Sequence, residues 1–180
     1  LANLTRVNTT PVVMLFSALP VLLAGGMLGI WPAALFGFIS GSISALWNTH
    51  SVFTPLETCV LFLILSYALR QEYRSPIFEI IRRPIASTLL TIVLSVPVFL
   101  ISTFLSTDGT AAARLDAAFT ESWMLVFVNG IPLLIAGLLC DVFKVVRSKY
   151  WVNVDSMRPS PGESGLQKRI LYTAVPIVVI

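Results

Sequence analysis

Long apolar runs, separated by short polar connections, dominate the hydropathy pattern of the chain. Five runs lie at residues 11–28, 33–47, 55–69, 84–105 and 121–146. A helix that crosses the hydrocarbon core of a bilayer needs about 20 apolar residues, whereas a membrane β-strand shows about ten residues of alternating polarity. The runs are near-continuous rather than alternating. The pattern therefore predicts five membrane-spanning α-helices.

Helix-start signals support this division. Pro32 follows a Gly-rich turn and suits the first turn of the second span, where its missing N–H costs nothing. In the basic connection 70–83, Ser75 and Pro76 are typical of a helix N-cap and first turn, and isoleucines follow on one face. We expect a short helix there, lying on the membrane surface.

Two prolines fall inside predicted spans. Pro97 is expected to kink the fourth span. Pro132, close to Gly130, is expected to weaken a turn of the fifth span, so that neighbouring helices must help to satisfy the freed backbone groups. The polar stretch 106–120 is predicted to be a loop between these two spans.

The C-terminal part changes from polar to apolar. Residues 147–169 are rich in Pro, Ser and Gly and are typical of a flexible linker. The apolar run that ends at Ile180 follows two cations that could anchor it at the interface, which predicts a further span and a chain cut from a longer polypeptide. The predicted organisation is a transmembrane bundle at 1–150, a cytoplasmic linker at 151–169 and the start of a further span at 170–180.

Composition argues against a soluble fold. The chain is 56% hydrophobic and 12% charged, with a mean hydropathy of +0.87, whereas a soluble domain carries about 25% charged residues. In lipid every backbone polar group must be paired within the protein. We therefore predict an all-α, multi-pass integral protein of the inner (plasma) membrane, a bundle of five full spans plus the start of a sixth, with the lipid bilayer as its first partner.

The distribution of basic residues predicts the orientation. Ten of the twelve Lys and Arg residues lie in the connections 70–83 and 144–169, whereas the loops 48–54 and 106–120 contain only Arg114. The positive-inside rule places the two basic connections in the cytoplasm and the two polar loops outside.

Motifs of soluble enzymes are absent. The sequence has no phosphate-binding Gly-rich loop, HExxH motif or GxSxG elbow, and its single histidine argues against a triad or a multi-histidine metal site. Cys59 and Cys140 lack the spacing of a metal site or disulfide framework and are interpreted as small buried apolar residues. We expect no enzyme chemistry, cofactor, metal or nucleic-acid partner in this segment, while a catalytic domain beyond Ile180 stays open.

Small residues recur at intervals of four along the first two spans. Such ridges let membrane helices approach closely. Packing within the chain is the simpler interpretation, and a homodimer face or a docking face for a membrane partner subunit is the alternative. The predicted packing residues are Gly25, Gly29, Ala33, Gly37, Gly41 and Ala45.

Polar and aromatic residues gather at the outer ends of the second, third and fifth spans. Ionisable groups inside a span are costly and point to function. Tryptophan also favours membrane interfaces, Glu57 lies one turn from water, and Asn129 could bridge helices instead. With His50 adding pH sensitivity, the predicted site for a small molecule from outside comprises Trp47, Asn48, His50, Thr54, Glu57, Trp123 and Asn129.

Several segments together resemble a known family. The run Ala24-Gly25-Gly26-Met27-Leu28-Gly29-Ile30-Trp31-Pro32, followed by Gly37, Gly41 and then Phe53-Thr54-Pro55, is similar to the substrate-binding S components of energy-coupling-factor vitamin transporters and to the five-span sensor domain of LytS-type histidine kinases. The resemblance covers roughly residues 11–150. It implies a Gly-rich cytoplasmic turn, an external polar loop and then a basic cytoplasmic connection.

The chain departs from S components in two ways, and these set the functional alternatives. S components have six spans and end soon after the last, whereas this chain shows five and continues through a linker. The first hypothesis is a membrane-embedded small-ligand sensing module at the N-terminal side of a bacterial signalling protein. The alternatives are an S component that captures a vitamin-like solute for an ATP-driven partner, and a membrane anchor or packing scaffold without a ligand.

Overall fold

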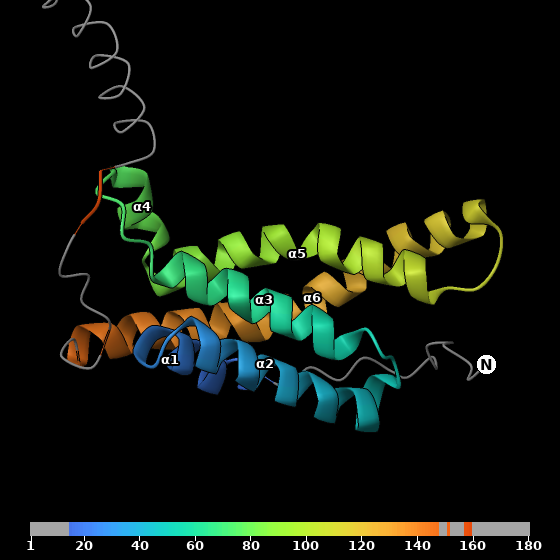
Figure 1. The fold of residues 1–180 in the computed structure, drawn as a ribbon, viewed down its shortest axis with the longest axis horizontal. Coiled ribbons are helices and arrows are strands. Elements are labelled where there is room, and N and C mark those ends of the chain that lie inside the picture. Colours follow the sequence, from blue (N-terminus) through green and yellow to red (C-terminus); the bar gives the residue numbers. More distant parts are fainter. Residues whose placement is uncertain (1–14, 148–150, 152–156, 160–180) are drawn as a thin grey trace, which may run out of the picture.

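The computed structural model describes residues 15–147, 151 and 157–159. Within these ranges every regular element is a helix (Figure 1), apart from one isolated bridge between Tyr73 and Arg158. The elements are α1 (Leu19–Met27), α2 (Ile30–Ser44), a π-helical turn η1 (Ala45–Thr49), α3 (Thr54–Leu69), α4 (Pro76–Ile81), α5 (Pro84–Ser106) and α6 (Ala111–Val146).

Three of the described helices are long and apolar enough to cross a membrane. They are α2 continued into η1 over Ile30–Trp47, α5 and α6. The helix α3 is also apolar but has 16 residues, about 24 Å at 1.5 Å per residue. The predicted first span, 11–28, lies partly outside the described residues, and the predicted sixth lies wholly outside them.

Burial in the bundle differs from that in a water-soluble protein, because apolar side chains also cover the outside and hydroxyl groups lie inside beside apolar residues such as Leu22 and Phe99. Large apolar side chains such as Trp31 (82% exposed) and Phe127 (67% exposed) point outward from the described helices, whereas hydroxyl groups on α5 lie inside. A face this apolar would be unstable in water, and lipid is the solvent that accepts it. The buried hydroxyl residues of α5 are Ser87, Thr88, Thr91, Ser95, Ser102, Thr103 and Ser106.

The polar stretch between α5 and α6 corrects the sequence prediction. Residues 106–120 were expected to form a loop, but α6 begins at Ala111. The Thr110 side chain caps it by accepting a hydrogen bond from the Ala113 backbone N–H (3.4 Å), and the alanines that follow favour helix. Gly109, at φ 130°, makes the turn before it.

The structure confirms two further predicted helices and differs from the prediction at one cysteine. The short helix after Ser75 is confirmed as α4, and the fourth predicted run is confirmed as α5, one residue longer than expected. Pro97 and Pro132 lie inside α5 and α6, which stay helical on both sides of them. Cys140 is buried, but Cys59 is only half-buried, contrary to expectation.

Two close helix pairs make up the bundle. The helix α2 packs along α3, and α5 packs along α6; α3 then contacts α5, and α1 contacts α2, α3 and α6. One end of the bundle, which we call the loop end, holds the connections 50–53 and 107–110 (Figure 1). The opposite end, which we call the basic end, holds the α1–α2 turn, α4 and the C-terminus of α6.

The small residues of α2 face α3 within the same chain. A Cβ atom at Gly37 would lie 2.5 Å from Phe62 Cδ2, and one at Gly41 would lie 2.8 Å from Pro55 Cα. The Thr58 hydroxyl occupies this crossing and donates a hydrogen bond to the Gly37 carbonyl oxygen (2.9 Å). Glycine is required here because any side chain would separate the two helices.

The other predicted packing residues lie along the same side of the bundle. Gly25 packs against Ser66 of α3, and Ala33 is buried. Gly29 makes the α1–α2 turn at φ 132°, a conformation that favours glycine. Ala45 begins η1 and is half-buried. Their described contacts are within the chain.

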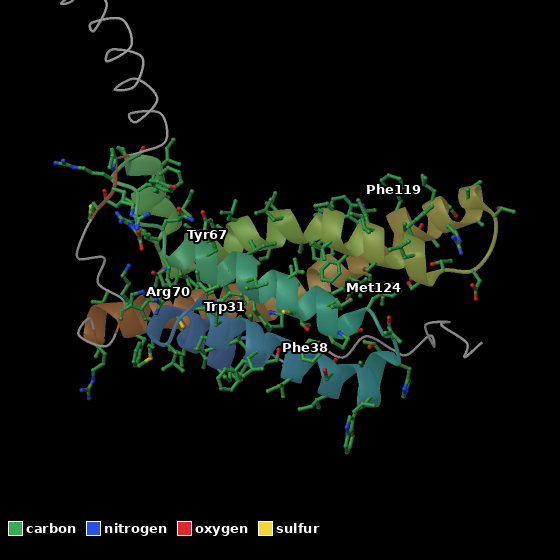
Figure 2. The ribbon with its side chains drawn as sticks, viewed as in Figure 1. Trp31, Phe38, Tyr67, Arg70, Phe119 and Met124 are labelled. Atoms are coloured by element: carbon green, nitrogen blue, oxygen red, sulfur yellow. The ribbon has the colours of Figure 1, made fainter. Side chains whose placement is uncertain are left out.

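A single arginine ties the α1–α2 turn to the end of α3. The Arg70 side chain donates a hydrogen bond from Nε to the Gly25 carbonyl oxygen (3.0 Å) and is labelled in Figure 2. Burial lowers the pKa of its guanidinium group, because desolvation disfavours the charged form. The hydrogen bond to the Gly25 carbonyl oxygen offsets part of the cost of desolvating the guanidinium group.

Pieces of the predicted linker contact the basic end. Trp151 is buried, and its ring lies so close to Gly26 that a Cβ there would be 2.5 Å from Trp151 Cη2. Arg158 forms an ion pair with Glu72 (3.0 Å). The rest of residues 151–169, and residues 170–180, lie outside the described residues, so the linker and the further span stay predictions.

Candidate functional site

Local hydrogen bonds hold the start of α3 in place at the loop end. The Thr54 and Thr49 hydroxyl oxygens lie 2.7 Å apart, which joins the end of η1 to the first residue of α3. The Ser51 hydroxyl accepts a hydrogen bond from the Phe53 backbone N–H (3.3 Å). Pro55 follows in the first turn, where proline is well tolerated. These contacts fix the direction in which the first turn of α3 presents its side chains.

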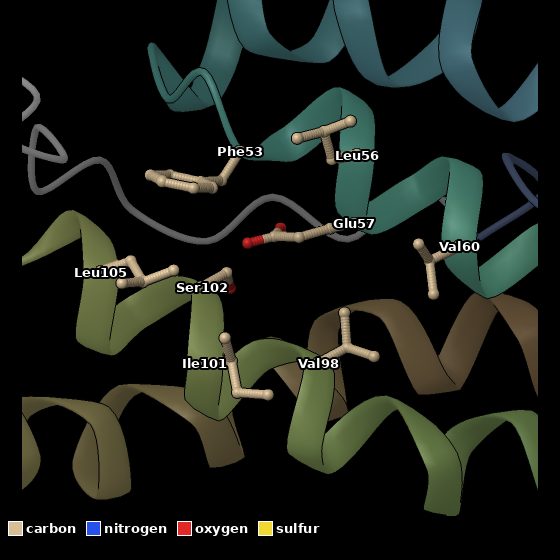
Figure 3. A pocket seen from close by; sticks show the side chains of 8 residues that line it. All are labelled: Phe53, Leu56, Glu57, Val60, Val98, Ile101, Ser102 and Leu105. Carbon is tan, nitrogen blue, oxygen red and sulfur yellow. The ribbon is translucent and has the colours of Figure 1, made fainter.

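A groove runs between the first turns of α3 and the last turns of α5. Its volume is about 220 Å³. Figure 3 shows the lining side chains of α3 above and those of α5 below. The lining residues are Phe53, Leu56, Glu57, Val60, Val98, Ile101, Ser102 and Leu105.

Glu57 is the ionisable side chain of this groove. It is only 6% exposed, and its carboxylate extends into the space between the two helices (Figure 3). Its backbone N–H donates to the Phe53 carbonyl oxygen (2.9 Å), which places it in the first turn of α3. The positive end of the helix dipole favours a carboxylate there. A buried carboxylate among apolar walls suits a ligand that brings a cationic or hydrogen-bond-donating group.

Ser102 contributes the second polar group, from α5. Its hydroxyl donates to the Phe99 carbonyl oxygen (3.1 Å), so its oxygen is oriented by its own helix. Ser102 and the apolar lining residues of α5 were not among the site residues predicted from the sequence. The signal was present as Ser and Thr at intervals of three or four along the run 84–106, which marks a buried helix face.

The structure separates most of the predicted site residues from one another. Of those seven, Glu57 is the one that lines the groove. The Trp47 and Trp123 side chains point outward, 77% and 58% exposed, as expected for membrane-facing tryptophans. The Asn129 amide donates to the Leu125 carbonyl oxygen of its own helix (2.9 Å).

The remaining predicted residues lie around the η1–α3 connection. Thr54 is buried and engaged with Thr49. His50 is exposed in a left-handed conformation (φ 49°) directly after η1. Asn48 lies within η1, and its side chain is outside the described part of the structure.

A second hollow lies between α1 and α2, with a volume of about 270 Å³. It carries no ionisable group, so it offers fewer means of orienting a ligand. Its lining residues are Ser17, Pro20, Val21, Phe36, Ile39, Ser40 and Ile43. Over the described ranges, no group of three or more His, Cys, Asp or Glu residues could hold a metal ion.

These features are those of an all-helical fold, over the described residues, with three helices long and apolar enough to cross a membrane and an acidic group buried in an apolar groove. No family model, no curated protein and no solved structure matches the chain. The function is therefore inferred from the groove itself.

Proposed function

We propose that this chain is a membrane-embedded module that binds a small molecule in the groove between α3 and α5. The observation that carries the proposal is the Glu57 carboxylate, 6% exposed in a groove whose other walls are almost entirely apolar. In membrane helices, ionisable groups inside an apolar span commonly mark binding sites. The ligand class that fits is a small apolar molecule with one amine or other hydrogen-bond donor.

We further propose that the chain crosses the membrane five times, begins a sixth crossing, and lies in the inner membrane with its loop end outside. In this arrangement the groove opens near the outer surface, and binding reaches a signalling region through the basic end. The alternative is an S component of a vitamin transporter, for which the same groove would be the capture site. A scaffold without a ligand is the third proposal, and the tight α2–α3 packing at Gly37 and Gly41 favours it.

The test is a ligand-induced thermal shift on purified protein in detergent. The library contains lipophilic amines, vitamins, nucleobases and peptides. We expect an amine to raise the melting temperature, and we expect Glu57→Gln to weaken its binding by roughly tenfold or more, because a hydrogen bond to a charged group contributes about 1.5–3 kcal/mol. Ser102→Ala should weaken binding by less.

Asp116→Asn is the matched control, because this carboxylate is exposed on α6 near the same end of the bundle. It should leave binding unchanged. If a ligand is found and Glu57→Gln binds it with unchanged affinity, the groove is not the site. If no library member shifts the melting temperature of the parent protein, the scaffold proposal is favoured.

A further inference from the structure

The basic end carries a group of cations that the groove does not use. Arg82 and Arg83 end α4 and lead into α5, and Lys144 lies in the last turn of α6. We call these three residues the basic triad. Lys144 lies within electrostatic reach of Arg82, Arg83 and Asp141, so the helices bring the three charges to one place. Arg83 is exposed, and the other two side chains are partly exposed.

The neighbouring carboxylate cannot compensate all three charges. Asp141 carries one negative charge, and its Oδ2 atom accepts a hydrogen bond from the Ile85 backbone N–H (3.3 Å), at the N-terminus of α5. Arg82 donates a hydrogen bond to the Gln71 carbonyl oxygen (3.4 Å), which is neutral. The triad with Asp141 therefore keeps a net positive charge.

Two of the other charges at this end are engaged elsewhere, and the exposed carboxylate of Glu79 on α4 can cancel at most one more charge of the triad. Arg70 bonds to the Gly25 carbonyl oxygen, and Glu72 forms its ion pair with Arg158. These contacts hold the α3–α4 connection against the bundle. Neither contact supplies an anion to the triad, which therefore remains a cationic patch.

An apolar surface adjoins the triad. Ile77 and Ile80 of α4 are 66% and 58% exposed. Tyr73 and Phe78 pack their rings together, with centroids 4.9 Å apart, which holds α4 in place against its own connection. A short helix with exposed isoleucines beside arginines is suited to the boundary between headgroups and acyl chains.

We propose that the basic triad binds the headgroup of an anionic phospholipid, whose acyl chains lie against the adjacent apolar helix surfaces. Charge complementarity selects an anion, and arginine pairs with phosphate oxygens through two parallel N–H bonds. The exposed isoleucines select a lipid over a soluble anion, because a free phosphate would leave them in water. This inference is independent of the groove and of any ligand that it binds.

The experiment measures the melting temperature of the purified protein in neutral detergent with added lipid. Dioleoyl phosphatidylglycerol is the probe, and dioleoyl phosphatidylcholine and glycerol phosphate are the comparisons. We expect phosphatidylglycerol to raise the melting temperature by several degrees and the other two to have little effect. The substitutions Arg82→Gln, Arg83→Gln and Lys144→Gln, combined in a triple variant, each remove one triad charge. Each should lower the apparent affinity for phosphatidylglycerol, taken from the lipid concentration that gives half of the melting-temperature shift, by roughly fivefold.

Arg114→Gln is the matched control, because this arginine lies near the loop end and its guanidinium stacks on Phe104 (5.9 Å to the ring centroid). It should retain the full response to phosphatidylglycerol. The exposed Arg83→Gln variant is measured alone as well, so that a fold defect in the triple variant does not decide the result. Equal stabilisation by phosphatidylcholine, a response to glycerol phosphate alone, or an unchanged lipid response in the Arg83→Gln and triple variants would overturn the proposal.

Discussion

Gly37 and Gly41 set how closely α2 approaches α3. At Gly41 the nearest atom is the Thr58 hydroxyl oxygen, followed by backbone atoms of Thr54 and Pro55, which cannot rotate away. At Gly37 the nearest atom belongs to the Phe62 ring. The Thr58 hydroxyl fills the remaining space and bonds to the Gly37 carbonyl oxygen. Close backbone approach of this kind replaces hydrophobic association, which is weak between helices in lipid.

Gly41→Ala should therefore destabilise the bundle by about 1–3 kcal/mol, the usual cost of overpacking a tight site. Gly130→Ala is the matched control, because a Cβ there would lie 3.5 Å from the flexible Ile92 side chain, an ordinary contact. Alanine is the better helix former by about 1 kcal/mol, so the control should be neutral or slightly stabilising. Unfolding in mixed micelles gives the free energy of unfolding of both variants. Equal values for the two would contradict the proposed close packing at Gly41.

At the scale of elements, the pairing of α5 with α6 depends on fitted small and hydroxyl side chains. A Cβ at Gly137 would lie 2.6 Å from Thr88 Oγ1 and 3.1 Å from Thr88 Cγ2. The Thr88 hydroxyl is turned back to the Ile85 carbonyl oxygen (2.8 Å), so its polarity is satisfied within α5. The contact is therefore one of shape rather than of a hydrogen bond between helices.

This arrangement predicts compensation between the two helices. Gly137→Ala should lower the melting temperature because the new methyl group meets Thr88. Thr88→Ala removes the two nearest atoms that it meets and leaves Ile85 Cα at 3.3 Å, so the double variant should recover most of the lost stability. Such non-additivity is expected for residues in direct contact. Additive losses in the double-variant cycle would show that the two helices do not meet at this point.

The start of α6 shows where the hydropathy pattern misleads. Asp108, Thr110 and Asp116 are polar, and we therefore expected a loop over 106–120, but alanines and the Thr110 cap extend the helix into this stretch. At 36 residues, α6 measures about 54 Å and exceeds a hydrocarbon core of about 30 Å. A helix of this length has turns to spare beyond one crossing, so its polar first turns need not lie in the apolar layer.

At the scale of the whole molecule, the fold gathers the described cations of residues 70–83 and those near the end of α6 at one end. Figure 1 places α4 and the C-terminus of α6 together at the basic end, opposite the connection 107–110. Their distribution along the sequence predicts a cytoplasmic location for these cations. A common location in space is a necessary condition for that orientation.

Cysteine labelling tests the orientation. In a background in which Cys59 and Cys140 are replaced by alanine, Ser75→Cys should resist an impermeant thiol reagent in intact cells, and Thr110→Cys should react. Both positions should react once the membrane is permeabilised, which controls for accessibility. The reverse labelling pattern in intact cells would place the basic end outside and refute the proposed topology.

The sequence alone determined the helical class, the short helix α4, the extent of α5 and the glycines at the α2–α3 crossing. These follow from local properties: hydropathy along the chain, proline and serine at helix starts, and the spacing of small residues. They were also enough to include Glu57 among seven candidate site residues, because an ionisable group inside an apolar run is costly.

The tertiary structure decided which side chains share a site. Trp47, Trp123 and Asn129 were predicted to lie near the same outer end of the bundle as Glu57, yet the tryptophans face outward and Asn129 bonds to its own helix. The partner of Glu57 in the groove is α5, which contributes Ser102. Depth in a membrane can be read from sequence position, but the rotation of each helix depends on long-range packing, such as Gly37 on Phe62 and Gly137 on Thr88. Those contacts join residues far apart in the chain, and no local pattern specifies them.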